Sequence, residues 1–102
     1  MAPTASTQRD DILKALRDQR ASLEPFGVAR LFLFGSFVRD EARTDSDVDL
    51  LVEFDRPIGL FEFVRLQRHL AEIVGHPVDL VTPAALKPQL RDRILSEAVV
   101  AA

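Results

Sequence analysis

Gly35-Ser36 and Asp47-x-Asp49 are the residues of this 102-residue chain whose types and spacing suggest chemistry, and ten residues separate Ser36 from Asp47. Gly35 has no Cβ, so the backbone there can turn sharply and a ligand can approach it closely. The segment 37–42 predicts two helical turns, which would leave unpaired backbone N–H groups and the Ser36 hydroxyl at a helix N-terminus. This pair therefore predicts a binding site for a phosphate group.

Asp47 and Asp49 form the second half of the pattern. On a strand, side chains two residues apart share one face, and their Cα atoms would lie about 6.6 Å apart. Two such charges repel unless a cation lies between them. Carboxylate oxygens without His or Cys favour Mg²⁺ or Mn²⁺, and Mg²⁺ usually binds one or two carboxylates together with substrate phosphates. Asp79, near the start of a later strand, could supply a third carboxylate to a two-metal site if that strand neighbours the one with Asp49.

The segments that must position these groups alternate between helical and extended patterns. Apolar residues recur at helical spacing from Ile12 to Leu23 and from Leu60 to Val74. A last helix is predicted to begin near Pro88 and to carry an apolar stripe of Leu90, Ile94, Leu95 and Ala98. Short apolar runs rich in β-branched or aromatic residues predict three strands, over 28–34, 47–54 and 78–81. The sequence therefore predicts an α/β (α+β) fold in the order α-β-α-β-α-β-α, with about three core strands flanked by helices.

The length of the chain and the composition of its N-terminus predict how it is divided into domains. Residues 1–7 are small and polar and predict a flexible N-terminal tail, in which Ser6 or Thr7 could cap the first helix. A single domain is predicted over residues 8–102, because 102 residues is a usual length for a domain with one hydrophobic core. So short a chain leaves little room for a separate domain that recognises the substrate. We therefore expect a partner to provide the specificity.

Composition excludes several classes of protein. The absence of Cys excludes a disulfide framework and a thiolate metal site. The 13 basic residues against 16 acidic ones give a net charge of −3, which has the wrong sign for wide contact with a nucleic-acid backbone. The sequence shows neither a signal peptide nor an apolar run of about 20 residues, the length that spans a membrane. We therefore expect a cytoplasmic protein without stable nucleic-acid or membrane binding.

The motif Gly35-Ser36-x10-Asp47-x-Asp49, followed by Leu-Leu-Val, resembles that of the DNA polymerase β-like nucleotidyltransferase superfamily. The short chain is similar to the minimal nucleotidyltransferase (MNT) members of that superfamily, from about residue 12 to residue 99. The resemblance implies that Gly35 and Ser36 hold nucleotide phosphates and that Asp47 and Asp49 bind the metals. It also implies that Asp79 is the third carboxylate, which helps to activate the attacking group, and that the sheet is mixed.

Arg39 resembles the arginine of the Gly-Ser-x-x-Arg-Gly stretch that is common in MNT proteins. The resemblance implies that Arg39 contacts the nucleotide phosphates. The glycine that follows the arginine in the family is Asp40 here, which adds a negative charge beside the predicted phosphate site.

Minimal members of the family resemble antitoxins encoded beside HEPN-domain ribonuclease toxins, which they inactivate by moving AMP from ATP onto a toxin tyrosine. The resemblance therefore implies a protein adenylyltransferase of a type VII-like toxin–antitoxin pair, with two Mg²⁺ ions, or Mn²⁺ in their place, and with ATP as donor. Two alternatives remain open. One is a non-catalytic module that neutralises its partner by binding it, and the other is a nucleotidyltransferase for a small molecule such as an aminoglycoside.

Simpler interpretations exist for each feature. Gly35-Ser36 alone could be a capped turn, and the two aspartates could be the solvated face of a strand. An EF-hand calcium loop is excluded, because Leu50 replaces its required Gly and Arg56 stands where its bidentate Glu belongs. The combination of motif and predicted elements favours the nucleotide site over these interpretations.

Overall fold

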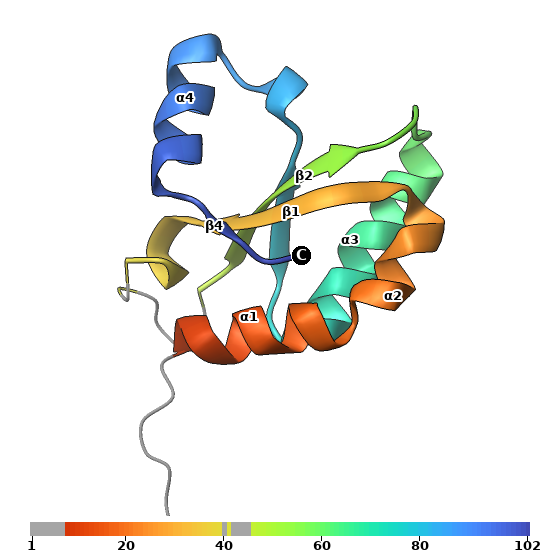
Figure 1. Cartoon of the computed structure of the whole chain (residues 1–102), viewed down its shortest axis with the longest axis horizontal. Coiled ribbons are helices and arrows are strands. Elements are labelled where there is room, and N and C mark those ends of the chain that lie inside the picture. Colours follow the sequence, from red (N-terminus) through yellow and green to blue (C-terminus); the bar gives the residue numbers. More distant parts are fainter. Residues whose placement is uncertain (1–7, 40, 42–45) are drawn as a thin grey trace, which may run out of the picture.

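A four-stranded mixed sheet forms the centre of the computed structural model, which describes residues 8–39, 41 and 46–102 (Figure 1). The strand order is β3-β2-β1-β4. The strands are β1 (Val28–Phe34), β2 (Val48–Phe54), β3 (Val78–Val81) and β4 (Val99–Val100). β1 runs antiparallel to both β2 and β4, whereas β2 and β3 are parallel. The sheet is therefore mixed, as the resemblance implied.

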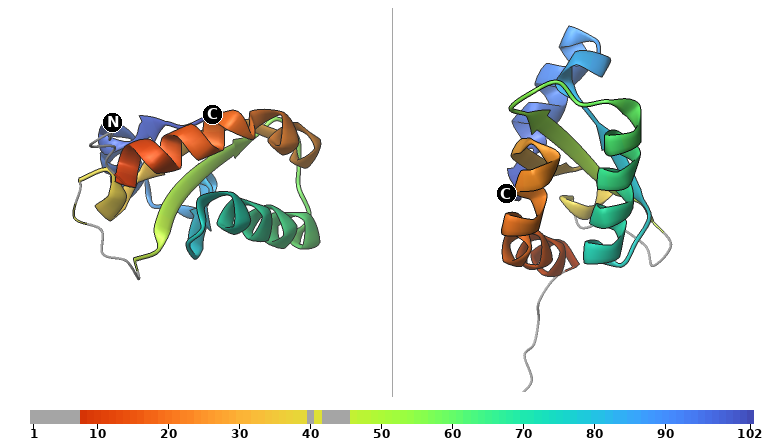
Figure 2. Two further views of the ribbon diagram at one scale, coloured as in Figure 1. Left: turned by 90° about the horizontal axis from the view of Figure 1, so that it is seen from below. Right: turned by 90° about the vertical axis from the view of Figure 1, so that its right-hand side faces the viewer.

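Helices lie on two sides of this sheet. They are α1 (Gln8–Asp18), α2 (Arg20–Leu23), α3 (Leu60–Val74) and α4 (Pro88–Glu97). α1 and α3 contact each other, and α3 also packs along β3. In Figure 1 and in the right-hand view of Figure 2, α4 stands on the opposite side of β1 from α1. No helix within the described residues is long and apolar enough to cross a membrane.

The hydrophobic core lies between the sheet and the pair α1 and α3. Because alternate residues of a strand point to opposite faces, β1 and β2 each send every second side chain into this core. The fully buried members from the strands and from α3 are Leu31, Leu33, Val48, Leu50, Val52, Leu66 and Leu70. Burial of each such side chain contributes about 1.5–3 kcal/mol. The face of β2 turned away from this core carries Asp49, so the hydrophobic alternation decides where the candidate site lies.

The three predicted strands and the helix 60–74 are confirmed within one residue, since Asp47 lies just before β2 rather than in it. Three features differ from prediction. The first helix is broken at Gln19, whose backbone leaves the helical region at φ −105° and ψ 15°. The turn brings Leu23 into the core, where it is 1% exposed. β4 was not predicted, because two residues are too short to show a pattern.

The third difference concerns α4. Leu90 and Leu95, predicted members of its apolar stripe, are 46% and 37% exposed, and no side chain of α4 is fully buried. The predicted tail 1–7 with its caps Ser6 and Thr7, Asp40, and the segment 42–45 lie outside the described residues.

Candidate functional site

Register pairing across the sheet places two of the predicted carboxylates side by side. Asp49 of β2 is the partner of Asp79 of β3, and residues directly opposite one another on neighbouring strands project to the same face. The neighbouring pairs in this parallel ladder are the buried residues Val48 with Val78 and Leu50 with Leu80. A slip of one residue would turn the aspartates into the core, so this hydrophobic pattern fixes the register.

Gly35 lies directly against the carboxylate of Asp49. Its φ of +80° is in the left-handed region, which L-residues other than glycine rarely adopt. A Cβ built on Gly35 would overlap Oδ2 of Asp49 and would lie 3.0 Å from Cγ. The residue must therefore be glycine for two independent reasons, backbone conformation and space. The predicted phosphate corner and the predicted metal ligands thus meet at one edge of the sheet.

The turn after Gly35 is tighter than predicted. A 3₁₀-helix spans Gly35–Phe37, and both Val38 N–H and Arg39 N–H donate to the Gly35 carbonyl, at 3.1 and 3.3 Å. The first of these bonds is an i→i+3 bond and the second an i→i+4 bond, but no α-helix follows: the two helical turns predicted over 37–42 are absent from the described part of that segment. Ser36 lies in this turn and is half-buried, so the dipole of a long helix does not act at this position.

Phe37 anchors the turn to the rest of the molecule. Its ring is 1% exposed and meets the His76 ring edge-on, with centroids 5.2 Å apart. The same edge is held by the Val48 N–H, which donates to the Pro77 carbonyl at 2.8 Å. The end of β1 and the starts of β2 and β3 are therefore fixed relative to one another.

The pKa of Asp49 is raised above its ordinary value, first by burial and then by the negative charges of Asp79 and Asp47. The positive charge of Arg39 acts in the opposite direction. These interactions show that the three predicted carboxylates and Arg39 share one electrostatic neighbourhood. A cation at this position would relieve the repulsion that disfavours the ionised form of Asp49.

The donor set fits a hard divalent cation, because carboxylate oxygens are the ligands that Mg²⁺ and Mn²⁺ prefer. As placed, no three His, Cys, Asp or Glu side chains among the described residues converge closely enough to hold one ion. Asp47 and Asp79 are both exposed, so rotation of either side chain toward Asp49 would disturb little packing.

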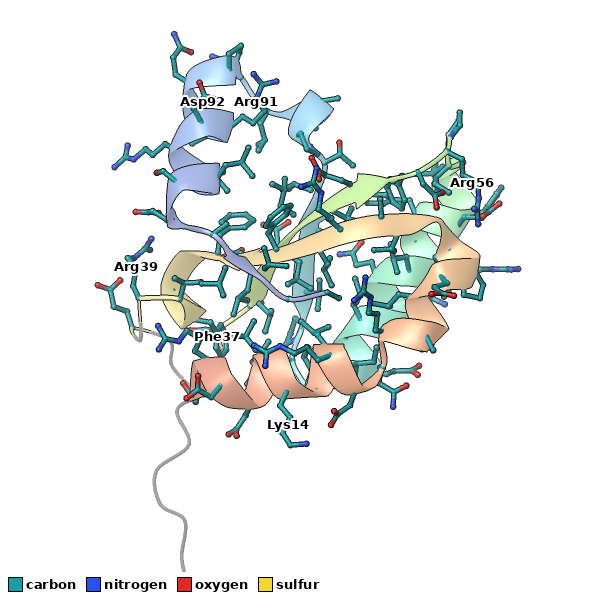
Figure 3. The ribbon with its side chains drawn as sticks, viewed as in Figure 1. Lys14, Phe37, Arg39, Arg56, Arg91 and Asp92 are labelled. Atoms are coloured by element: carbon teal, nitrogen blue, oxygen red, sulfur yellow. The ribbon has the colours of Figure 1, made fainter. Side chains whose placement is uncertain are left out.

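Arg39, the predicted phosphate ligand, is held by two carboxylates. Its Nε lies 2.9 Å from Oε1 of Glu41, and Nη1 lies 3.6 Å from Oε2 of Glu97 at the end of α4. Figure 3 shows Arg39 beside the turn that carries Phe37. Arg39 is therefore close to the site, but a phosphate would have to compete with its present partners.

One part of the neighbourhood was missed by sequence reasoning. A pocket of about 290 Å³ lies between α4 and the end of β1, and Arg93 and Leu90 of α4 line it together with Gly35 and Arg39. No motif in the sequence marks Arg93, because the pattern of this helix shows only an apolar stripe. A larger pocket of about 400 Å³, between α1 and α3, has none of the predicted site residues in its lining.

A glycine corner packed against one of two paired aspartates therefore lies at one edge of a small mixed sheet. Residues 13–101 match the family model described as nucleotidyltransferase domain. The chain belongs to this family.

Two curated relatives sharpen the comparison. A protein of Methanocaldococcus jannaschii that carries the name protein adenylyltransferase is 47% identical over 73 residues, which are 72% of this chain and 78% of the relative. The protein adenylyltransferase MntA of Thermococcus cleftensis is 43% identical over 76 residues, 74% of this chain and 77% of the relative.

Solved structures agree on the fold. A structure described as a minimal nucleotidyltransferase is 40% identical and superposes with a TM-score of 0.71, over 85% of this chain and 93% of that one. A complex of a tri-AMPylated Shewanella oneidensis HEPN toxin with an MNT antitoxin is 21% identical, with a TM-score of 0.57 over 93% of this chain and 69% of that one. The second likeness shows the fold alone.

Proposed function

We propose that this protein is a metal-dependent adenylyltransferase that moves AMP from ATP onto a hydroxyl group, that of a tyrosine, of a partner HEPN ribonuclease toxin and thereby acts as its antitoxin. The observation that carries the proposal is the position of Asp49, which touches Gly35 on one side and pairs with Asp79 on the other. The names of the two curated relatives support the reaction, and the fold shared with the antitoxin of the Shewanella complex supports the partner.

In this reaction the hydroxyl oxygen of the acceptor attacks the α-phosphorus, the bond between the α-phosphorus and the bridging oxygen breaks, and pyrophosphate leaves. Asp47 and Asp49 would hold two Mg²⁺ ions, which supply charge neutralisation at the phosphates and lower the pKa of the acceptor hydroxyl. Asp79 would accept the proton that the hydroxyl loses. The backbone N–H groups of the turn at Ser36 would neutralise charge that develops on the departing phosphates.

Transfer of label from ATP to the co-purified partner tests the reaction directly. The protein and the toxin encoded by the neighbouring gene are incubated with Mg²⁺ and ATP labelled at the α-phosphate, and label on the toxin is measured together with released pyrophosphate. Asp47→Asn and Asp79→Asn should each lower the rate at least about a hundredfold, since each removes a charge that stabilises the transition state.

Asp55→Asn is the matched control, because Asp55 follows the other end of β2, where it pairs with Arg56 at 3.1 Å. This variant should transfer AMP at the wild-type rate. A toxin that stays unlabelled by the wild-type protein in an intact complex would contradict the proposal. Full protection of cells by Asp47→Asn would show instead that binding alone neutralises the partner.

A further inference from the structure

α4 is attached to the site rather than to the core. None of its side chains is fully buried, and its C-terminal residue Glu97 lies 3.6 Å from Arg39. The pocket of about 290 Å³ separates α4 from Phe34 and Gly35 at the end of β1. A helix that leaves a pocket beside a predicted phosphate corner, instead of closing on the sheet, suggests that a ligand occupies the space.

The pocket opens on the same face of the sheet as the carboxylates. Phe34 is the register partner of Asp49, which is in turn the partner of Asp79, so the three side chains form one row across β1, β2 and β3. Neighbouring strands lie about 4.8 Å apart, which makes the row about 10 Å long. The row leads from the acidic pair past Gly35 into the pocket under α4.

The electrostatic character reverses along this row. The end at Asp49 and Asp79 is acidic, whereas the pocket at the other end is lined by two arginines, Arg39 and Arg93, and by one carboxylate, Glu97, which is paired with Arg39. A polyphosphate matches such a gradient, because metal-bound phosphates suit the carboxylates and the remaining phosphate charge suits the arginines.

Arg93 is the better candidate of the two arginines. Arg39 is engaged by Glu41 and Glu97. Within the described part of the chain no ion pair engages Arg93, whose side chain lines this pocket and a second one of about 270 Å³ with Lys87. The planar guanidinium presents two parallel donors that suit a phosphate.

We propose that the pocket under α4 is the subsite for the terminal phosphates of the nucleotide, and for the pyrophosphate after transfer, and that Arg93 is its principal cation. This inference rests on the proposed function. It makes α4 the element that distinguishes a nucleoside triphosphate from a monophosphate, because AMP carries no phosphate that reaches the pocket.

The test compares Arg93→Gln with Arg91→Gln by calorimetric titration in the presence of Mg²⁺, with ATP, AMP and inorganic pyrophosphate as ligands. Arg91 is the matched control, since it lies on the same helix, loses the same charge and has its Nε 3.7 Å from Oδ1 of Asp92. Figure 3 shows Arg91 and Asp92 at the end of α4 far from Arg39. Thermal unfolding of both variants checks that the fold is intact.

Arg93→Gln should weaken binding of ATP and of pyrophosphate about tenfold or more, as expected for loss of a charge-assisted contact, and should leave AMP binding unchanged. Arg91→Gln should bind all three ligands like the wild type. Equal losses in the two variants, or an equal loss of AMP binding by Arg93→Gln, would overturn the subsite. Failure of the proposed function has a different signature, in which the wild type binds ATP but transfers no AMP to its partner.

Discussion

Substitution of Gly35 by alanine tests whether the glycine corner and Asp49 form one unit. The left-handed φ of +80° costs an L-residue about 1–2 kcal/mol. The added Cβ would also overlap Oδ2 of Asp49 and lie 3.0 Å from Cγ, which forces that side chain out of its rotamer at a further cost of about 0.5–1.5 kcal/mol. Gly35→Ala should therefore lower the free energy of unfolding by about 1.5–3.5 kcal/mol.

Gly75→Ala provides the matched control for this experiment. Gly75 ends α3 with φ +72°, but a Cβ there would meet nothing within 4 Å. Its substitution should cost only the backbone strain of about 1–2 kcal/mol and should leave binding of ATP with Mg²⁺ unchanged. Urea unfolding measures the stability of both variants, and calorimetry measures their nucleotide binding.

A double variant separates the steric effect from the strain. With Asp49→Ala in the background, the carboxylate that the new Cβ would strike is absent, so Gly35→Ala should cost no more than Gly75→Ala does in the wild-type background. If the two glycine variants are equally destabilised in wild type, or if the cost at Gly35 persists without the Asp49 carboxylate, the contact on which the site depends does not exist.

Three further perturbations probe the charges and the packing around the site. Because the pKa of Asp49 is raised in the folded protein, the folded state binds this proton more tightly than the unfolded state does, and stability contributed by the protonated group is lost as pH rises through the raised pKa. Asp49→Asn should therefore be more stable than wild type at neutral pH without Mg²⁺, with a difference that vanishes in acid; a difference independent of pH in urea unfolding would contradict this. Glu97→Gln removes a carboxylate that competes for Arg39, so ATP binding measured by calorimetry should tighten severalfold. The free energy of unfolding should change by less than about 1 kcal/mol, as for other exposed ion pairs. Weaker ATP binding would show instead that Glu97 positions Arg39. Leu16→Ala should lower the free energy of unfolding by about 2–5 kcal/mol, because Leu16 is fully buried. Leu95→Ala on α4 should lower it by well under that in the same assay, because Leu95 is partly exposed. Similar losses in the two variants would refute the peripheral placement of α4.

Local patterns in the sequence were sufficient to predict most elements of this fold. The spacing of Val48, Leu50 and Val52 predicts one core face and places Asp49, with Leu51, on the other face, and the structure confirms this. β4 escaped prediction because its two residues gain order only by pairing with β1, 66 to 68 residues earlier in the chain. The break at Gln19 was not predicted for a related reason. The change of direction there lets Leu23 pack into the core, and this long-range packing leaves no local pattern in the sequence.

The candidate site was predictable from spacing only in part, because its geometry depends on pairing between strands. Gly35 meets Asp49 because antiparallel β1 ends at the edge where β2 begins, and Asp79 joins them because β3 is parallel to β2 and begins at that same edge. A motif match identifies the residues, whereas the buried ladder around Leu50 decides that their side chains share a face. Arg93 has no such pattern, because α4 approaches the corner through the tertiary fold alone, so only the structure shows that Arg93 lies beside Gly35 and Arg39.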